Sequence, residues 1–102
     1  MSLYTQQSPF PMTPDEQISF VIDASPIATS PYTSLTFTLY DESNEDADVS
    51  STKTSGSISA SGDDITTKLV ISLVKCNNYR GEVKFTDASS NVREFYIRIL
   101  CR

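Results

Sequence analysis

The side chains that could do chemistry in this chain are carboxylates, hydroxyls and two thiols, because its 102 residues include no histidine. Without histidine, the usual general base of hydrolases and the commonest zinc ligand are both missing. Serine and threonine are abundant, but the lysines form no motif that would activate a serine nucleophile. No glycine-rich phosphate loop is present. The sequence therefore predicts no catalytic residue and no cofactor, and we expect a protein that is not an enzyme.

One acidic segment has the residue types of a cation site. Residues 41–48 read Asp-Glu-Ser-Asn-Glu-Asp-Ala-Asp, and calcium prefers clustered carboxylates on a flexible loop. The segment lacks the glycine and the spacing of helical calcium loops, and no helix is predicted beside it. We interpret it as a solvated loop and expect no calcium or other metal site.

The two cysteines are Cys76 and Cys101. Two cysteines without histidine are too few for a disulfide scaffold or a zinc site. They are either two free thiols or one disulfide near the C-terminus. The hairpin predicted below places both near the same end of the domain, which is compatible with a bond but does not require one.

The charge and the apolar stretches exclude further classes of function. The net charge is −5 and the eight lysines and arginines are scattered, which argues against nucleic-acid binding. The longest apolar stretches, residues 69–74 and 95–100, are too short to cross a bilayer as helices. Residues 1–12 lack the basic start and apolar block of a secretory signal. We expect no membrane insertion, and the sequence leaves the localisation open.

Strands are the elements that must position these side chains. Residues 1–14 contain three prolines and predict an extended N-terminal arm, whereas residues 15–102 have the length of a single domain. Alternating apolar and polar residues predict strands in seven segments: 17–23, 34–41, 49–54, 57–61, 65–74, 79–87 and 93–100. No segment keeps a helical period. About seven short strands at this spacing predict an all-β, antiparallel, immunoglobulin-like β-sandwich.

The alternation also assigns side chains to faces. The inward faces include Ile18 with Phe20, and Phe37 with Leu39. Three apolar residues are predicted to point outward and are candidate partner contacts: Tyr40, Val70 and Tyr96. Single exposed apolar residues are normal on a protein surface, so this patch has a plain structural explanation as well.

The last two strands predict a hairpin whose register follows from matching faces. Pairing Phe85 with Phe95 sets inward residues opposite inward residues, and it places Asp87 opposite Arg93. A shift by one residue would set inward residues against outward ones. We therefore predict the register with Phe85 opposite Phe95.

The hairpin carries a family resemblance. Residues 79–92 read YRGEVKFTDASSNV, which resembles the last hairpin of bacterial and phage immunoglobulin-like domains, with its tyrosine, alternating valine and aromatic residues, and Thr-Asp-Ala-Ser-Gly-Asn turn. Ser90 stands where glycine is usual, so either the turn is wider or Asn91 adopts the left-handed conformation. The tryptophan and the Tyr-x-Cys corner of antibody-type domains are absent.

The resemblance implies a structural or adhesive module and transfers no catalytic residue. Our first hypothesis is a non-enzymatic module of a phage virion, in the tail, baseplate or neck, that contacts protein partners or copies of itself. The alternative is a bacterial surface or secreted domain that binds a glycan or a host protein through the acidic loop and exposed tyrosines. The first would place the protein in the virion, and the second outside the cell or on its surface.

Overall fold

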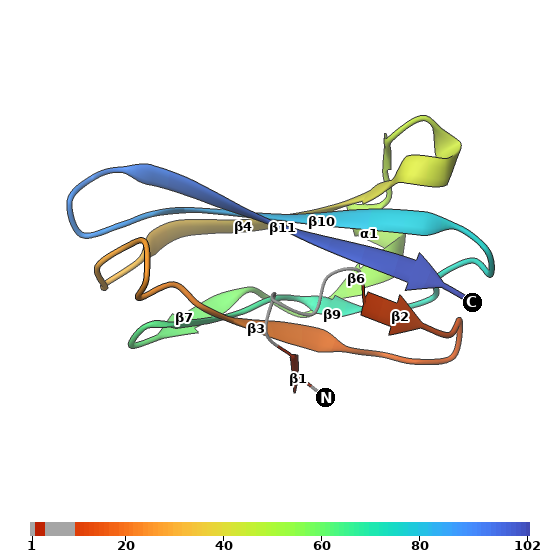
Figure 1. Cartoon of the computed structure of the whole chain (residues 1–102), viewed down its shortest axis with the longest axis horizontal. Coiled ribbons are helices and arrows are strands. Elements are labelled where there is room, and N and C mark those ends of the chain that lie inside the picture. Colours follow the sequence, from red (N-terminus) through yellow and green to blue (C-terminus); the bar gives the residue numbers. More distant parts are fainter. Residues whose placement is uncertain (1, 4–9) are drawn as a thin grey trace.

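The computed structural model describes residues 2–3 and 10–102, which form two stacked layers of β-sheet (Figure 1). The elements in chain order are β1 (Ser2–Leu3), β2 (Phe10–Met12), β3 (Ser19–Asp23), β4 (Thr33–Asp41), η2 (Glu42–Asn44), β5 (Ala47–Asp48), α1 (Ser50–Lys53), β6 (Thr54–Ser55), β7 (Ser59–Ser61), β8 (Asp64–Thr66), β9 (Leu69–Val70), β10 (Asn78–Thr86) and β11 (Val92–Cys101). One layer is a five-stranded sheet in the order β2-β11-β10-β4-β5. The other contains a four-stranded sheet, β1-β3-β8-β7, and the pair β6-β9. The predicted all-β sandwich is confirmed, although several expected strands are divided into shorter ones.

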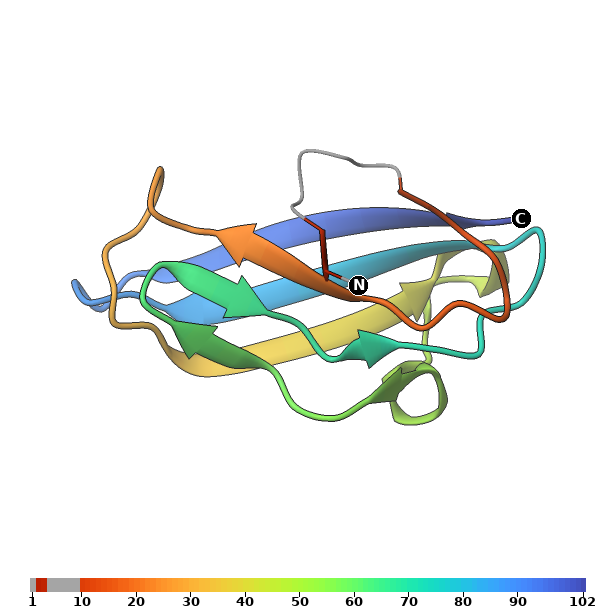
Figure 2. The same cartoon turned by 90° about the horizontal axis from the view of Figure 1, so that it is seen from below.

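The core lies between the two layers and is built from the inward side chains of both. Figure 2 shows the second layer lying across the first. The predicted inward faces of β3 and β4 are confirmed, because Ile18, Phe20, Phe37 and Leu39 are all buried. The largest side chains with less than 2% exposure are Tyr79, Phe20, Phe85, Met12, Ile22, Leu39, Ile65, Ile97, Ile99, Val70 and Val83.

Neighbouring strands are antiparallel, as predicted, except for the two that precede residue 13. β1 pairs with β3, and β2 pairs with β11, both in parallel. The predicted proline-containing arm over residues 1–14 falls partly outside the described residues. Within its described part, Phe10 and Met12 are buried in the core, so this part of the arm belongs to the sandwich.

The β10–β11 hairpin forms where it was predicted, but its predicted register is wrong by two residues. Phe85 lies opposite Arg93, and Phe95 lies opposite Val83. Asp87 is the cause, because its Oδ1 accepts two backbone N–H bonds of 2.9 Å inside the turn and so ends the strand before it. A shift of two keeps every side chain on its predicted face. The rings of Phe85 and Phe95 still stack, with centroids 5.9 Å apart.

The turn of this hairpin also settles which residue is left-handed. Ser90 itself has a φ of 65°, so the glycine-like conformation stays at the position where the related domains carry glycine. The backbone N–H of Ser90 donates to the carbonyl of Asp87 at 3.1 Å. The turn therefore keeps its tight form without a glycine.

The predicted long strand over residues 65–74 is wrong, because the chain breaks at Thr67 into β8 and β9. The Thr67 N–H donates to the Phe20 carbonyl at 2.9 Å, and its hydroxyl accepts from the Phe20 N–H at 2.9 Å. A side-chain oxygen thus replaces a backbone acceptor in the ladder. The alternation changes phase after the break, so Ile65 and Val70 are both fully buried. Val70 exchanges two backbone bonds with Ile18, of 2.8 and 3.1 Å.

The predicted strand over residues 49–54 is wrong as well. Its centre is the one-turn helix α1. Asp48 Oδ1 accepts from the N–H of Ser50 at 3.0 Å, and Ser50 Oγ accepts from the N–H of Leu39 at 2.8 Å. These bonds turn the chain back toward β4. No helix among the described residues is long and apolar enough to cross a membrane.

Candidate functional site

The five-stranded sheet has one face on the core and one directed away from it, which we call the open face (Figure 1). Its side chains come from β4, β10 and β11 and lie in rows across the strands, because residues alternate between the faces. The three rows are Tyr40, Arg80 and Arg98; Thr38, Glu82 and Tyr96; and Thr36, Lys84 and Glu94. Apart from the turn around η2 at one end, no described element is stacked on this face. It is therefore a sheet surface available to a partner in the described structure.

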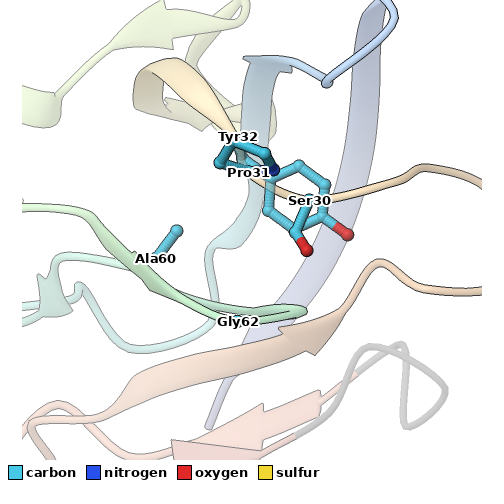
Figure 3. A pocket seen from close by; sticks show the side chains of 5 residues that line it. All are labelled: Ser30, Pro31, Tyr32, Ala60 and Gly62. Atoms are coloured by element: carbon cyan, nitrogen blue, oxygen red, sulfur yellow. The ribbon is translucent and has the colours of Figure 1, made fainter.

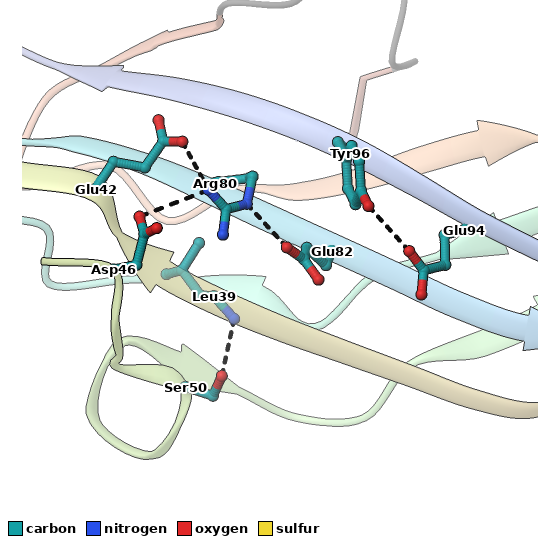
Figure 4. Close-up of polar contacts among 8 residues, drawn as sticks. All are labelled: Leu39, Glu42, Asp46, Ser50, Arg80, Glu82, Glu94 and Tyr96. Carbon is teal, nitrogen blue, oxygen red and sulfur yellow. Dashed lines mark hydrogen bonds and ion pairs between the residues drawn. The ribbon is translucent and has the colours of Figure 1, made fainter.

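Arg80 is held between carboxylates at one end of the open face (Figure 4). Its Nη1 lies 2.8 Å from Glu42 Oε2 and 3.5 Å from Asp46 Oδ1, and its Nε lies 2.8 Å from Glu82 Oε2. Its Cζ lies 5.0 Å from the centroid of the Tyr40 ring. The hydrogen bond to Glu82 raises the pKa of Arg80, while partial desolvation acts in the opposite direction. Arg80 therefore remains a cation and fixes the Tyr40 ring against the sheet.

Tyr96 projects from the middle of β11. It is 56% exposed, and its hydroxyl donates to Glu94 Oε2 at 3.0 Å (Figure 4). This hydrogen bond raises the pKa of Tyr96. Tyr40 and Tyr96 thus both lie on the open face, separated by β10, and their role as partner contacts stays a prediction.

Val70, the third predicted contact, does not belong to this surface. It lies on β9 in the other layer and is completely buried. Its outward assignment assumed an uninterrupted strand, and the break at Thr67 reverses the face. The charged members of the open face, such as Arg80 and Glu82, were not selected from the sequence, although their alternation with the inward Val83 would have placed them there.

The acidic segment of residues 41–48 is folded against the same end of the sheet. Asp41 is buried, and its carboxylate accepts from the Ser43 N–H at 3.0 Å and from Asn77 Nδ2 at 3.1 Å. Glu42 and Asp46 contact Arg80. Over residues 2–3 and 10–102, no group of three or more acidic, cysteine or histidine side chains could hold a metal ion. Four carboxylates of this segment have protein partners, namely those of Asp41, Glu42, Asp46 and Asp48.

The two cysteines lie at the same end of the sandwich, as predicted. Both are free thiols, with Cys76 exposed and Cys101 buried, so the disulfide that the sequence left open is not formed in this structure. The N–H of Cys76 donates to the carbonyl of Cys101 at 2.8 Å. Burial raises the pKa of the Cys101 thiol, and the nearby Cys76 adds to the rise.

The opposite end of the sandwich gathers several connections and is called the loop end (Figure 2). Its connections are residues 24–32, 62–63 and 87–91. Backbone bonds join them: Ala88 donates to Thr29 at 2.9 Å, and Ala24 donates to Asp63 at 2.9 Å. The first bond ties the turn of the β10–β11 hairpin to the connection that joins the two layers, and the second continues the β3–β8 ladder, so the loop end is held together by more than its own turns.

A pocket of about 230 Å³ opens at the loop end (Figure 3). The residues that line it are Ser30, Pro31, Tyr32, Ala60 and Gly62. The Tyr32 hydroxyl donates to the Ala28 carbonyl at 3.2 Å and lies 3.5 Å from Asp63 Oδ1. Desolvation raises the pKa of Tyr32, and the charge of Asp63 raises it further. The Tyr32 hydroxyl therefore keeps its proton, and the pocket can accept a small group. The sequence did not predict it, since its walls come from the connection of residues 24–32 and from the distant strand β7 with the turn that follows it.

Comparison with known proteins shows the fold of this chain but does not assign it to a family. No family model and no curated protein matches this sequence. Among solved structures, the chain is similar to the cysteine protease inhibitor EhICP2 from Entamoeba histolytica, with a TM-score of 0.55 and 12% sequence identity. The match covers 99% of this chain and 93% of that chain. At this identity the likeness shows the fold alone, and it agrees with the immunoglobulin-like sandwich of the described residues.

Proposed function

We propose that this chain is a non-enzymatic module of a phage virion that binds protein through its open face. The proposal depends mainly on Tyr96, which projects from the middle of β11 on the open face with 56% of its surface exposed. The virion assignment is supported by the resemblance of the hairpin over residues 79–92 to phage immunoglobulin-like domains. The similarity to a solved protease inhibitor supports the broader statement that such a fold binds proteins.

The open face has the residue types of a binding surface, and its tyrosine side chains are already held in place by neighbouring side chains. Tyrosine and arginine dominate the energetic centres of protein interfaces. Tyr40 is already packed beneath Arg80, and Tyr96 is already bonded to Glu94, so little side-chain freedom is lost when a partner arrives. The open face therefore presents two aromatic anchors at low entropic cost.

The charge of the open face permits contact with a second copy as well as with another protein. Arg80, Lys84 and Arg98 share the face with Glu82 and Glu94, and Glu42 and Asp46 lie against Arg80, so charges of both signs alternate there. The whole chain carries −5, so a face of mixed charge, on which opposite charges of two copies can be paired, is favoured over the rest of the acidic surface. Self-association through the open face is thus the simplest form of the proposal.

The experiment measures molar mass by light scattering after gel filtration, together with pull-down of the neighbouring virion proteins. Tyr96→Ala is expected to weaken whichever association is found. Val74→Ala is the matched control, because Val74 is 49% exposed but lies in the turn before β10. A strict monomer that captures no virion protein would refute the proposal. Glycan or host-protein binding that depends on Tyr96 would favour the adhesive alternative instead.

A second candidate is inhibition of a cysteine protease. It is favoured by the similarity to EhICP2 over nearly the full length of both chains. The loop end offers a surface for it, since its connections are tied together by backbone bonds and Ile27 is 43% exposed there. A tied loop resists the extended conformation that proteolysis requires.

The test is the residual activity of a papain-like protease in the presence of the intact chain. Inhibition should be lost in Ile27→Asp and kept in Val74→Asp, which places the same charge at the opposite end. Full protease activity at large molar excess, or rapid cleavage of the chain, would eliminate this candidate. Neither result bears on the open face.

A further inference from the structure

Cys76 and Cys101 meet at the end of the sandwich opposite the loop end. Cys76 lies in the turn between β9 and β10, and Cys101 is the last residue of β11. The N–H of Cys76 donates to the Cys101 carbonyl at 2.8 Å, and the N–H of Cys101 donates to the Asn77 carbonyl at 3.0 Å. Two residues of the turn, Cys76 and Asn77, thus share Cys101 as partner, and the single 2.8 Å bond between Cys76 and Cys101 keeps their Cα atoms no more than about 6 Å apart. This limit lies inside the range of about 4.4–6.8 Å that a disulfide accepts.

The two thiols differ in access. Cys76 is exposed, whereas Cys101 is only 4% exposed. Burial raises the pKa of Cys101 with a contribution from Cys76 and a small one from Glu16, while Lys53 acts in the opposite direction. A reagent in solution therefore meets the exposed Cys76 before the buried Cys101.

We propose that Cys76 and Cys101 form a reversible redox-modification site, in which Cys76 reacts first and Cys101 resolves. The oxidant is a small disulfide such as oxidised glutathione. The Cys76 thiolate attacks one sulfur of that disulfide, which breaks its S–S bond and releases one glutathione thiolate. The Cys101 thiolate then attacks the Cys76 sulfur and releases the second glutathione. The protein loses two electrons and two protons, and the small disulfide gains them.

The bond would fasten the end of β11 to the turn that starts β10. β11 is also the strand on which β2 pairs, at Ile99 through Cys101, so the bond would secure the edge that holds the N-terminal segment. Both thiols stay reduced in a reducing cytosol and would join in an oxidising environment. The site is independent of the open face, because no residue of the open face takes part.

The test incubates the native protein in oxidised and then reduced glutathione and follows its intact mass and its melting temperature. The expected product has lost two hydrogen atoms and carries no glutathione. Because the bond closes a loop of about 26 residues, it should raise the melting temperature by on the order of 10 °C, and reduction should reverse the rise.

Two variants separate the steps. Cys101→Ser should accumulate a glutathione adduct at Cys76, and Cys76→Ser should stay unmodified while folded. Because Cys101 is buried, serine at this position could prevent folding, and Cys101→Ala then serves as the second variant. The mass measurement on the wild-type protein tests the proposal without either variant. Accumulation of a glutathione adduct on the wild-type protein, or no reaction below the unfolding transition, would overturn the proposal.

Discussion

Replacing Thr67 with valine should destabilise the domain more than replacing it with serine. Thr67 is 2% exposed, and its hydroxyl accepts from the N–H of the buried Phe20 at 2.9 Å. The same hydroxyl donates to the Lys68 carbonyl at 2.9 Å. Thr67→Val keeps the shape and volume but removes both bonds, whereas Thr67→Ser keeps both bonds and removes one methyl group.

The two costs can be compared from these contacts. A buried N–H that loses its acceptor costs about 1–3 kcal/mol, so Thr67→Val should lose about 2 kcal/mol of unfolding free energy. A buried methyl group contributes about 1 kcal/mol, which is the expected loss for Thr67→Ser. At about 4–8 °C per kcal/mol for a domain of this size, the valine variant should melt roughly 5 °C below the serine variant.

Urea denaturation of both variants and the wild type, followed by circular dichroism, measures the difference. Thermal melts of the same proteins provide a second reading. If the valine variant is as stable as the serine variant or more stable, the hydroxyl of Thr67 does not support the ladder. The explanation given above for the break between β8 and β9 would then fail.

Three further results are expected. In Gly81→Ala, the added methyl group would lie 2.8 Å from Phe37 Cε1, so the buried ring must shift and the unfolding free energy in urea should fall by about 1–3 kcal/mol. The backbone N–H of Asn91 is the main cause of the lowered pKa of Asp87. Folding stability from Asp87 is therefore present above its ordinary pKa of 3.8 and is lost as the pH falls through the lower folded value. Thermal melts at decreasing pH should accordingly show a smaller decrease of the melting temperature in Asp87→Asn than in the wild type. Equal decreases in the two proteins would contradict this. In Tyr79→Phe, the backbone N–H of Val74 loses the tyrosine hydroxyl that accepts its hydrogen bond at 2.9 Å. Thermal melting should therefore show a decrease of about 1 kcal/mol in the free energy of unfolding.

The sequence predicted the class of fold because the alternation of apolar and polar residues, which shows the inward face of a strand, can be read within each short segment. In β3 and β4 most inward positions are apolar and most of their neighbours are polar, so Phe20, Phe37 and Leu39 could be assigned before any contact was known. The two outward tyrosines, Tyr40 and Tyr96, were found by the same alternation. The rows that join them to Arg80 needed the pairing of β4, β10 and β11.

The wrong predictions share a cause, which is a side chain that bonds to the backbone of another residue. Asp87 bonds within its own turn and moves the hairpin register by two residues. Ser50 accepts from Leu39 and replaces a predicted strand with a helical turn. Such hydrogen bonds do not alter the alternation of apolar and polar residues in the sequence, because they depend on which groups meet after folding.

The sequence by itself determined that the chain alternates into strands, that its last two strands form a hairpin, and that both cysteines fall at one end. Alternation and turn composition are local properties, because they depend on residues that are neighbours in the sequence and not on which segments pack together. Tertiary structure alone decided that Val70 is buried, that the loop end contains a pocket, and that Cys76 bonds to the backbone of Cys101. Each of these depends on groups distant in the chain being brought within hydrogen-bonding or packing distance, and only the complete sandwich does that.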